Sequence, residues 1–342
     1  MLKMGLIGAG KMGKTHLFNM INSEEIDLVA VADTNVSNLK FAQKYGISDV
    51  FENYEDLLSL NDLDAVVISL PNFLRSQCIL CAAENGKHVF ADKPLARTLD
   101  EAIQIQKIVQ KAGIFLMVNT NYRFLPHVQK AKAIYDEGNI GDVEIATLEN
   151  LGCGPFSHGI IPTPVPEWWF NRDMVGGGAV IDLGYHLVDL FNWIFPNTKL
   201  LAAHLGYRYG MDLEDSGTIL LRSDSTGTKG VINAGWFCQT QFPRINFRML
   251  LHGMYGYVNS DELKPQSLYR YAMKTALANT AKKIAGRRFE KNIYTYYSIS
   301  HIESLKYFVA NLKSESFNSN LQEDLDVMRL IDEIYLNAKR DV

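Results

Sequence analysis

The chain has 342 residues, of which 47% are hydrophobic and 21% charged, and a net charge of −4 at pH 7. This length is too great for one ordinary hydrophobic core and predicts two domains, while the composition excludes disordered and fibrous architectures. The 34 basic side chains do not outnumber the 38 acidic ones, so we expect no nucleic-acid partner.

The segments that bear on localisation point to a cytoplasmic protein. Apolar runs such as residues 65–70 are far shorter than a membrane span, and no basic segment followed by an apolar stretch marks an export signal. We therefore expect no membrane insertion. Four cysteines do not make a disulfide framework. Cys78 and Cys81 lie in an apolar helical pattern without a second Cys-x-x-Cys pair, so we interpret them as helix packing and expect no metal site.

Between residues 1 and 120, short apolar runs alternate with amphipathic helical patterns. The runs are continuously apolar, which is typical of strands covered on both faces. This alternation predicts an α/β domain over residues 1–121 with a doubly wound parallel sheet, the Rossmann arrangement. The predicted strands cover residues 4–7, 28–32, 65–70, 88–91 and 115–118.

The loop after the first predicted strand has the pattern Gly-x-Gly-x-x-Gly and opens a predicted helix. Gly8 permits the tight turn, Gly10 lets a pyrophosphate approach the backbone, and Gly13 lets the helix pack close to the strand. The free N–H groups at the helix N-terminus favour phosphates. We predict a dinucleotide site that consists of Gly8, Gly10, Lys11, Met12, Gly13 and Asp33.

Asp33 indicates which dinucleotide is bound. It ends the second predicted strand, 20 positions after Gly13, where the dinucleotide pattern requires an acidic residue. A carboxylate there accepts hydrogen bonds from the ribose hydroxyls and repels a 2′-phosphate. Thr34 and Asn35 offer no cation, and the nearest one is Lys40. The sequence therefore favours NAD over NADP.

Four further motifs follow in order: Ser-Leu-Pro-Asn at 69–72, Gly-Lys-His-Val-Phe-Ala-Asp-Lys-Pro at 86–94, Asn-Tyr-Arg-Phe-Leu-Pro at 121–126, and a triple glycine leading to Asp-Leu-Gly-Tyr-His within 176–186. With the glycine loop, they resemble the Gfo/Idh/MocA oxidoreductases, which include glucose–fructose oxidoreductase and inositol dehydrogenase. The resemblance extends to the end of the chain and is strongest up to about residue 195. It specifies the family but no single substrate.

The resemblance implies roles for individual residues. Lys93 matches a lysine that reaches the reacting carbon near the nicotinamide. Asp182 and His186 match the acid and the histidine of the family's Asp-x-x-x-His motif. Pro71 and Asn72 match positions beside the cofactor near its nicotinamide end.

Two residues depart from the family pattern. Asp92, which we also assign to the cofactor site, is one methylene shorter than the usual glutamate and should still orient Lys93. Arg75 stands where the family commonly has a histidine, and its effect on the charge near the cofactor is left open.

The chemistry of the same residues supports catalysis. Asp182 and His186 are four residues apart in a predicted helix over 179–195, so they share one helical face. Oxidation of an alcohol needs a base, and histidine titrates nearest to working pH. Asp182 is expected to orient the ring or a substrate hydroxyl, and Lys93 to stabilise developing alkoxide charge. A structural Asp–His pair is the alternative, which the preceding triple glycine disfavours.

The residues after 121 predict a second, α+β domain over 122–342. Turns separate its strand candidates, which favours a mostly antiparallel sheet with helices on one face. The resemblance implies that this sheet forms a subunit interface, in a homodimer or homotetramer, and makes the predicted final helix, 321–338, a candidate to pack back on the first domain. The predicted strands cover residues 142–151, 199–209, 218–222, 229–237 and 245–252.

The irregular segment 152–178 is the first candidate for substrate contact, because long loops in compact domains are usually functional. Tryptophan rings stack on sugar rings and an arginine binds anions, although one tryptophan in this loop would equally serve to pack it down. His158 is left open between a site residue and a solvated one. The candidate substrate residues are Tyr122, Arg123, Trp168, Trp169 and Arg172.

A second unusual segment, 282–291, has five basic residues in ten. It is suited to the diphosphate of a nucleotide-linked sugar or to an acidic membrane surface. The plainer interpretation is a solvated helix end, because cations are favourable at helix C-termini.

These observations predict an NAD-dependent oxidoreductase that acts on a secondary hydroxyl of a sugar, a sugar derivative or a cyclic polyol. Two other classes in the family remain open. One is a glycosidase that uses the dinucleotide transiently, and the other is a non-catalytic regulator that senses it. Lys93, Asp182 and His186 are all present, which disfavours the regulator.

Overall fold

The computed structural model describes residues 1–156, 165–237, 245–287, 289, 296–314 and 321–340. The chain divides into two compact units. The first consists of residues 1–95, 103–125 and 265–321, and the second of residues 96–102, 126–264 and 322–342.

The first unit contains a six-stranded sheet with the order β3-β2-β1-β4-β5-β6, in which every neighbouring pair is parallel. This is the order of the doubly wound nucleotide-binding fold, so the expected Rossmann arrangement is confirmed. All four residues of β4 are fully buried, as expected for a strand covered on both faces. The strands are β1 (Leu2–Ile7), β2 (Ile26–Ala32), β3 (Asp49–Phe51), β4 (Ala65–Ile68), β5 (His88–Asp92) and β6 (Leu116–Asn119).

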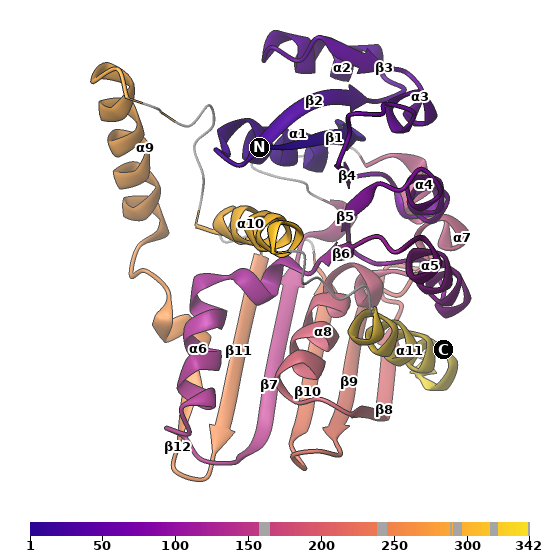
Figure 1. Cartoon of the computed structure of the whole chain (residues 1–342). Helices are drawn as coiled ribbons and strands as arrows, with labels where there is room; N and C mark the ends of the chain where they lie inside the picture. The colour runs from indigo at the N-terminus through magenta and orange to yellow at the C-terminus, as the bar shows by residue number, and fades with distance from the viewer. Residues whose placement is uncertain (157–164, 238–244, 288, 290–295, 315–320, 341–342) are drawn as a thin grey trace. The chain divides into compact units, whose positions relative to one another are not determined.

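Helices flank both faces of this sheet, with α1 and α10 on one side and α4 and α5 on the other (Figure 1). On the α10 side, Phe308 is fully buried and its ring lies 5.3 Å from Phe115 and 5.4 Å from Phe90. The helices of the unit are α1 (Lys11–Asn22), α2 (Val36–Lys44), α3 (Tyr54–Leu58), α4 (Asn72–Glu84), α5 (Leu99–Ala112, whose first turn groups with the second unit), α9 (Leu268–Ile284) and α10 (Ile299–Lys313).

The second unit contains a seven-stranded sheet with the order β12-β11-β7-β10-β9-β8-β13. The pairs β7–β10 and β8–β13 are parallel and the other four are antiparallel, so the expected mostly antiparallel sheet is confirmed. The strands are β7 (Val143–Gly152), β8 (Thr198–Gly206), β9 (Ser216–Ser223), β10 (Lys229–Trp236), β11 (Ile245–Gly253), β12 (Gly256–Asn259) and β13 (Lys339–Arg340).

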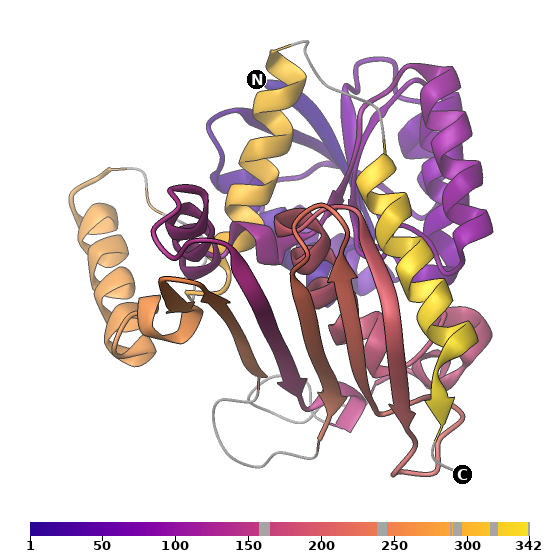
Figure 2. The ribbon, with the colours of Figure 1, turned by 90° about the horizontal axis from the view of Figure 1, so that it is seen from below.

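One face of this second sheet is covered and the other is exposed. Along β9, Ile219 and Leu221 are fully buried whereas Leu220 between them is 37% exposed. The helices of this unit are α6 (Pro126–Asp136), the short α7 (Arg172–Val175), α8 (Tyr185–Ile194) and α11 (Gln322–Asn337). Helix α11 packs on α8 and β8 and leads into β13 at the edge of the sheet (Figure 2).

The division into units differs from the expected single boundary at residue 121. Residues 265–321 group with the first unit, because the apolar face of α10 joins the core beside β5 and β6. The final helix, which the resemblance made a candidate for the first domain, groups with the second unit instead. Its apolar residues meet α8 in the same layer.

One helical stretch, Arg172–Ile194, is long and apolar enough to cross a membrane by composition alone. Its most apolar 18-residue window is 78% buried, as expected for a helix that forms a protein core. Cys78 is buried and Cys81 half-buried in α4, and both thiols are free, which agrees with a packing role.

Phe308→Ala tests the packing of α10 on the first sheet. Removing a fully buried ring leaves a cavity against Phe90 and Phe115, so we expect the free energy of unfolding to fall by about 3–5 kcal/mol. Urea unfolding followed by circular dichroism measures the loss. Tyr307→Ala, at a neighbouring side chain that is 53% exposed, is the control and should cost less than half as much.

Candidate functional site

The glycine loop between β1 and α1 is closed on one side and open on the other. A Cβ on Gly8, whose φ is +87°, would lie 2.4 Å from the carbonyl oxygen of Ser69, and a Cβ on Gly13 would lie 1.9 Å from that of Gly8. Nothing lies within 4 Å of the Cβ position of Gly10. The loop therefore packs tightly against β4 and leaves its backbone accessible at Gly10, as the approach of a pyrophosphate requires.

Asp33 is held at the end of β2 beside this loop. Its Oδ2 accepts hydrogen bonds from the backbone N–H of Ala9 at 2.7 Å and from the side chain of Asn38 at 3.2 Å. Its Oδ1 accepts the N–H of Asn35 at 2.8 Å. The carboxylate is thereby fixed next to the glycine loop. Lys11 and Met12 form the exposed first turn of α1, the remaining positions of the predicted dinucleotide site.

Arg75 has a structural explanation that the sequence did not supply. Its side chain is buried, 4% exposed, and donates hydrogen bonds to the carbonyl oxygen of Pro94 at 2.6 Å and of Leu70 at 2.8 Å. It also donates to Oδ1 of Asn72 at 3.1 Å. The guanidinium therefore ties Leu70, in the loop after β4, and Asn72, the first residue of α4, to the loop after β5, which carries Lys93.

Asp92, at the end of β5, is the centre of a buried polar network. Its carboxylate accepts from the hydroxyl of Ser69 at 2.7 Å and from Asn119 at 3.2 Å, and lies 2.9 Å from Nε2 of the fully buried His16. Burial alone would raise the pKa of Asp92, but the charge and hydrogen bond of His16, then Arg75 and Ser69, hold it well below its usual range. Asp92 therefore stays ionised beside Lys93.

His301, on α10, joins this network through Asn119, whose side-chain nitrogen lies 3.2 Å from Nδ1 of His301. Burial and the charge of His16 lower the pKa of His301 to about 4, although Asp92 acts in the opposite direction. His301 is therefore neutral at pH 7. The sequence did not indicate this residue, because it lies 209 positions after Asp92 and no motif marks it. The candidate substrate residues Tyr122 and Arg123 lie half-buried in a 3-10 turn, Asn121–Phe124, that packs on α10.

In the second unit, Asp182 and His186 lie at the start of the predicted helix. The helix begins with one π-helical turn, Val180–Gly184, and continues as α8. His186 is 7% exposed, and Asp182 accepts a hydrogen bond at 3.0 Å from Nε1 of the buried Trp236. Single π turns occur frequently at functional sites. Trp236, at the end of β10, was not singled out from the sequence. Its position at the end of a predicted strand was the one feature that could have marked it as a site residue.

The triple glycine before this helix wraps around a buried carboxylate. Oε1 of Glu214, which is fully buried, accepts hydrogen bonds from the N–H groups of Gly178 and Val180 at 2.8 and 3.1 Å, and from the hydroxyl of Tyr335 at 2.7 Å. A Cβ on Gly177 would lie 2.0 Å from the Tyr335 hydroxyl oxygen, and one on Gly178 would lie 2.1 Å from the carbonyl oxygen of Glu214. Glycine is therefore required at 178, where a Cβ would meet backbone, whereas a Cβ at 177 would displace the Tyr335 hydroxyl.

Glu214 carries an energetic cost. Burial raises the pKa of its carboxyl group, although the hydrogen bonds from Tyr335 and the backbone act in the opposite direction. Its second oxygen, Oε2, has no hydrogen-bond partner among the residues that the structure describes. Burial and Glu214 together raise the pKa of Tyr335 far above its usual value, so Tyr335 remains a donor.

The tryptophans of the irregular segment pack against a small apolar cluster of the second unit. Trp168 and Trp169 are half-buried against a small apolar cluster that includes Trp236, and the rings of Trp169 and Trp236 are 6.3 Å apart. Arg172 lies over the ring of Tyr335 at 5.0 Å. His158 lies outside the described residues. Lys93 belongs to the first unit, whereas Asp182, His186 and these loop residues belong to the second.

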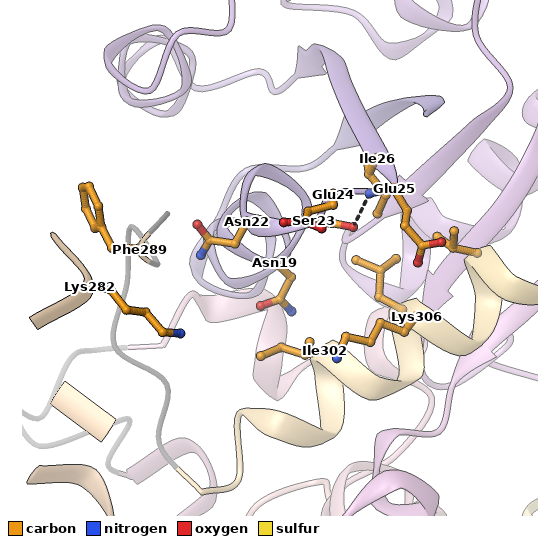
Figure 3. Close-up of a pocket in the computed structure, with 12 residues that line it drawn as sticks. Asn19, Asn22, Ser23, Glu24, Glu25, Ile26, Lys282, Phe289, Ile302 and Lys306 are labelled. Atoms are coloured by element: carbon orange, nitrogen blue, oxygen red, sulfur yellow. Dashed lines mark hydrogen bonds between the residues drawn. The ribbon is translucent and has the colours of Figure 1, made fainter. Parts of the chain in front are cut away.

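A separate cavity of about 520 Å³ lies in the first unit at the C-terminal end of α1, at the opposite end of this helix from the glycine loop (Figure 3). Asn19 and Asn22 of α1 line it together with Lys282 of α9 and Ile302 and Lys306 of α10. It is therefore not part of the dinucleotide site.

Two models of one protein family match most of the chain. Residues 2–120 match the model described as "Oxidoreductase family, NAD-binding Rossmann fold", and residues 128–259 match the "GFO/IDH/MocA C-terminal domain". The first match ends just after β6, the last strand of the sheet in the first unit.

Curated relatives share this family's oxidoreductase character. The chain is 30% identical over 216 residues to D-glucoside 3-dehydrogenase of Escherichia coli, covering 61% of this chain and 59% of that enzyme. It is 23% identical over 326 residues to myo-inositol 2-dehydrogenase of Thermotoga maritima, covering 92% and 89%. In four of the curated relatives, the E. coli enzyme among them, the match spans only 52–62% of the relative's length.

A solved structure of levoglucosan dehydrogenase in complex with NADH superposes with a TM-score of 0.76 at 22% identity, covering 98% of this chain and 96% of that one. At this identity, the likeness is one of fold.

Variants of Glu214 test the clamp on the triple glycine. Glu214→Ala leaves three buried donors without their acceptor, and we expect the free energy of unfolding at pH 7 to fall by at least about 2 kcal/mol. Glu214→Gln keeps one acceptor oxygen and should lose less. Urea unfolding measures both.

The difference in stability between wild type and Glu214→Gln has a predictable pH dependence. Because the folded-state pKa of Glu214 is raised above its ordinary 4.5, wild type is at its most stable relative to Glu214→Gln below that pH. This advantage is lost as the pH rises through the raised pKa. If the stability of wild type relative to Glu214→Gln increased with pH instead, the raised pKa of Glu214 would be contradicted.

Proposed function

Because the chain belongs to the Gfo/Idh/MocA oxidoreductase family, we propose that it transfers a hydride between a nicotinamide dinucleotide and the secondary hydroxyl or keto carbon of a sugar, a sugar derivative or a cyclic polyol. The observation that carries the proposal is the glycine loop that is open only at Gly10, with the carboxylate of Asp33 fixed beside it. The relatives named as D-glucoside and inositol dehydrogenases support the substrate class.

The residues at the end of β1 and β2 fit the dinucleotide. The backbone at Gly10 and the free N–H groups that open α1 would hold its pyrophosphate, with Lys11 and Met12 in the first helical turn. The carboxylate of Asp33 would accept the ribose hydroxyls and repel a 2′-phosphate, which supports NAD over NADP. Pro71 and Asn72 begin α4 at the end of the neighbouring strand β4.

The remaining residues supply the acid–base chemistry. When bound, the nicotinamide accepts or returns the hydride. His186 takes the proton of the substrate hydroxyl, and Asp182, held by Trp236, orients the substrate beside it. Lys93 donates a hydrogen bond to the reacting oxygen and stabilises the charge that develops there. Asp92, which stays ionised, directly precedes Lys93 and places a negative charge at the end of β5.

The exposed face of the second sheet supports an assembly of identical chains, a homodimer or homotetramer. Ile145 on β7 and Leu220 on β9 are 43% and 37% exposed on strands whose alternate residues are buried. Exposed apolar side chains on a flat sheet favour association. We also propose a cytoplasmic location, which the cysteine content supports.

Lys93→Ala and His186→Ala test the catalytic roles. Each variant removes one proton-handling or charge-stabilising group, so we expect turnover to fall by roughly 10²–10⁴-fold. A panel of sugars, inositols and nucleotide sugars, monitored by nicotinamide absorbance, provides the assay. Cofactor affinity should be unchanged, and Lys107→Ala, at an exposed lysine of α5, should keep full turnover. Near-normal turnover in both Lys93→Ala and His186→Ala would contradict their catalytic roles.

Cofactor preference depends on Asp33. We expect a higher kcat/KM with NAD than with NADP, and Asp33→Ser should narrow the ratio by about tenfold, equivalent to ~1.4 kcal/mol of lost discrimination. Asp27→Ser, at the exposed opposite half of β2, should leave the ratio unchanged. A clear preference of the wild type for NADP would overturn this proposal.

A further inference from the structure

Helix α9, Leu268–Ile284, has 17 residues, none of which is buried. The helices α10 and α11 have similar lengths, and each buries six residues. Most of the stability of a protein helix comes from the packing of an apolar face rather than from intrinsic propensity. A helix of this length without a buried side chain therefore has a face that still lacks its cover.

The helix has two apolar faces, of which one has a partner inside the first unit. On the inner face, the ring of Tyr271 packs edge-on against the buried Tyr296 at 5.5 Å. The other face presents a stripe of large apolar side chains at intervals of four, four and seven residues, which places them on one side of the helix. The stripe consists of Tyr269, Met273, Leu277 and Ile284, which are 75%, 45%, 67% and 83% exposed.

The charged residues of the segment that carries the stripe all have one sign. From residue 265 to residue 287 the chain has no acidic side chain, although the whole chain has a net charge of −4. At 100° per residue, Arg270 and Lys274 lie along one side of the stripe and Lys283 along the other. The cations of this segment are Arg270, Lys274, Lys282, Lys283 and Arg287.

We propose that α9 is a membrane-surface helix that docks on a bilayer containing anionic phospholipids. The helix lies in the plane of the interface, with the apolar stripe in the acyl boundary and the flanking cations at the lipid phosphates. Its four cations and its length of 17 residues exclude a spanning segment, which needs about 20 mostly apolar residues.

Other partners would match either the charges or the apolar stripe of this surface, but not both. A nucleic acid would match the cations but leave Met273, Leu277 and Ile284 in water. A second copy of the same helix would cover the stripe but bring two rows of cations together. An anionic bilayer meets the apolar and the charged requirement at once.

Vesicle co-sedimentation with the full chain tests the proposal. We expect binding to phosphatidylcholine vesicles that contain about 30% phosphatidylglycerol, weakening as salt is added, and little binding to phosphatidylcholine alone. Leu277→Glu, and Lys274→Glu combined with Lys283→Glu, should each weaken binding at least about tenfold. All three residues are exposed, so the variants should keep the wild-type unfolding midpoint and the activity toward soluble substrate.

Two matched variants separate α9 from general effects of charge and apolar surface. Leu336→Glu, at a 76% exposed leucine of α11, and Lys107→Glu on α5 should bind anionic vesicles as the wild type does. Absence of binding to anionic vesicles, or undiminished binding by Leu277→Glu, would overturn the proposal. A change in oligomeric mass on Leu277→Glu without vesicle binding by the wild type would also overturn it and assign α9 to a protein interface.

Discussion

The close approach of three strand ends around Ser69 is the constraint on which the first unit depends. Strand β4 lies between β1 and β5, so its carboxyl end meets the glycine loop on one side and the Asp92–Lys93 turn on the other. The carbonyl of Ser69 excludes any side chain at Gly8, and its hydroxyl binds Asp92. This is the switch point of the sheet, where doubly wound folds bind their ligands. Arg75 then ties the loop after β4, through Leu70, to the loop after β5, through Pro94.

The second unit uses a buried carboxyl group to hold its backbone in place. Burial makes the ionised form of Glu214 costly and raises its pKa, and hydrophobic replacement of buried charged groups is often neutral or stabilising. Here Glu214 accepts hydrogen bonds from the backbone N–H groups at the start of the helix that carries Asp182 and His186. The N-cap residue of that helix makes no side-chain capping hydrogen bond. Tyr335 completes the set from the last helix, which packs on α8 and β8 in the same unit. Positional precision at the site is thus obtained at a cost in stability.

Helix α9 differs from both sites because the fold leaves its outer face uncovered. Its exposed stripe and one-signed charges are features of an interface rather than of a core. The helix is separate in sequence from the glycine loop and from the Asp182–His186 segment, so a docking function could vary without disturbing the chemistry. A lipid surface also needs no shape complementarity, only apolar area and charge.

The sequence by itself determined the features that depend on local geometry. The glycine pattern, the acidic residue 20 positions later and the alternation of apolar runs specified the first sheet, because turn conformation and strand burial are encoded within short stretches. The tertiary structure decided the partners of Arg75, Glu214, Asp182 and His301 and the position of α10. These contacts join residues far apart in the chain, and a single sequence contains no periodicity or spacing that pairs them. The contact of the loop tryptophans with Trp236 was likewise decided by the tertiary structure, because the sequence pattern of a tryptophan that stacks on a ligand does not differ from that of one that packs in a core.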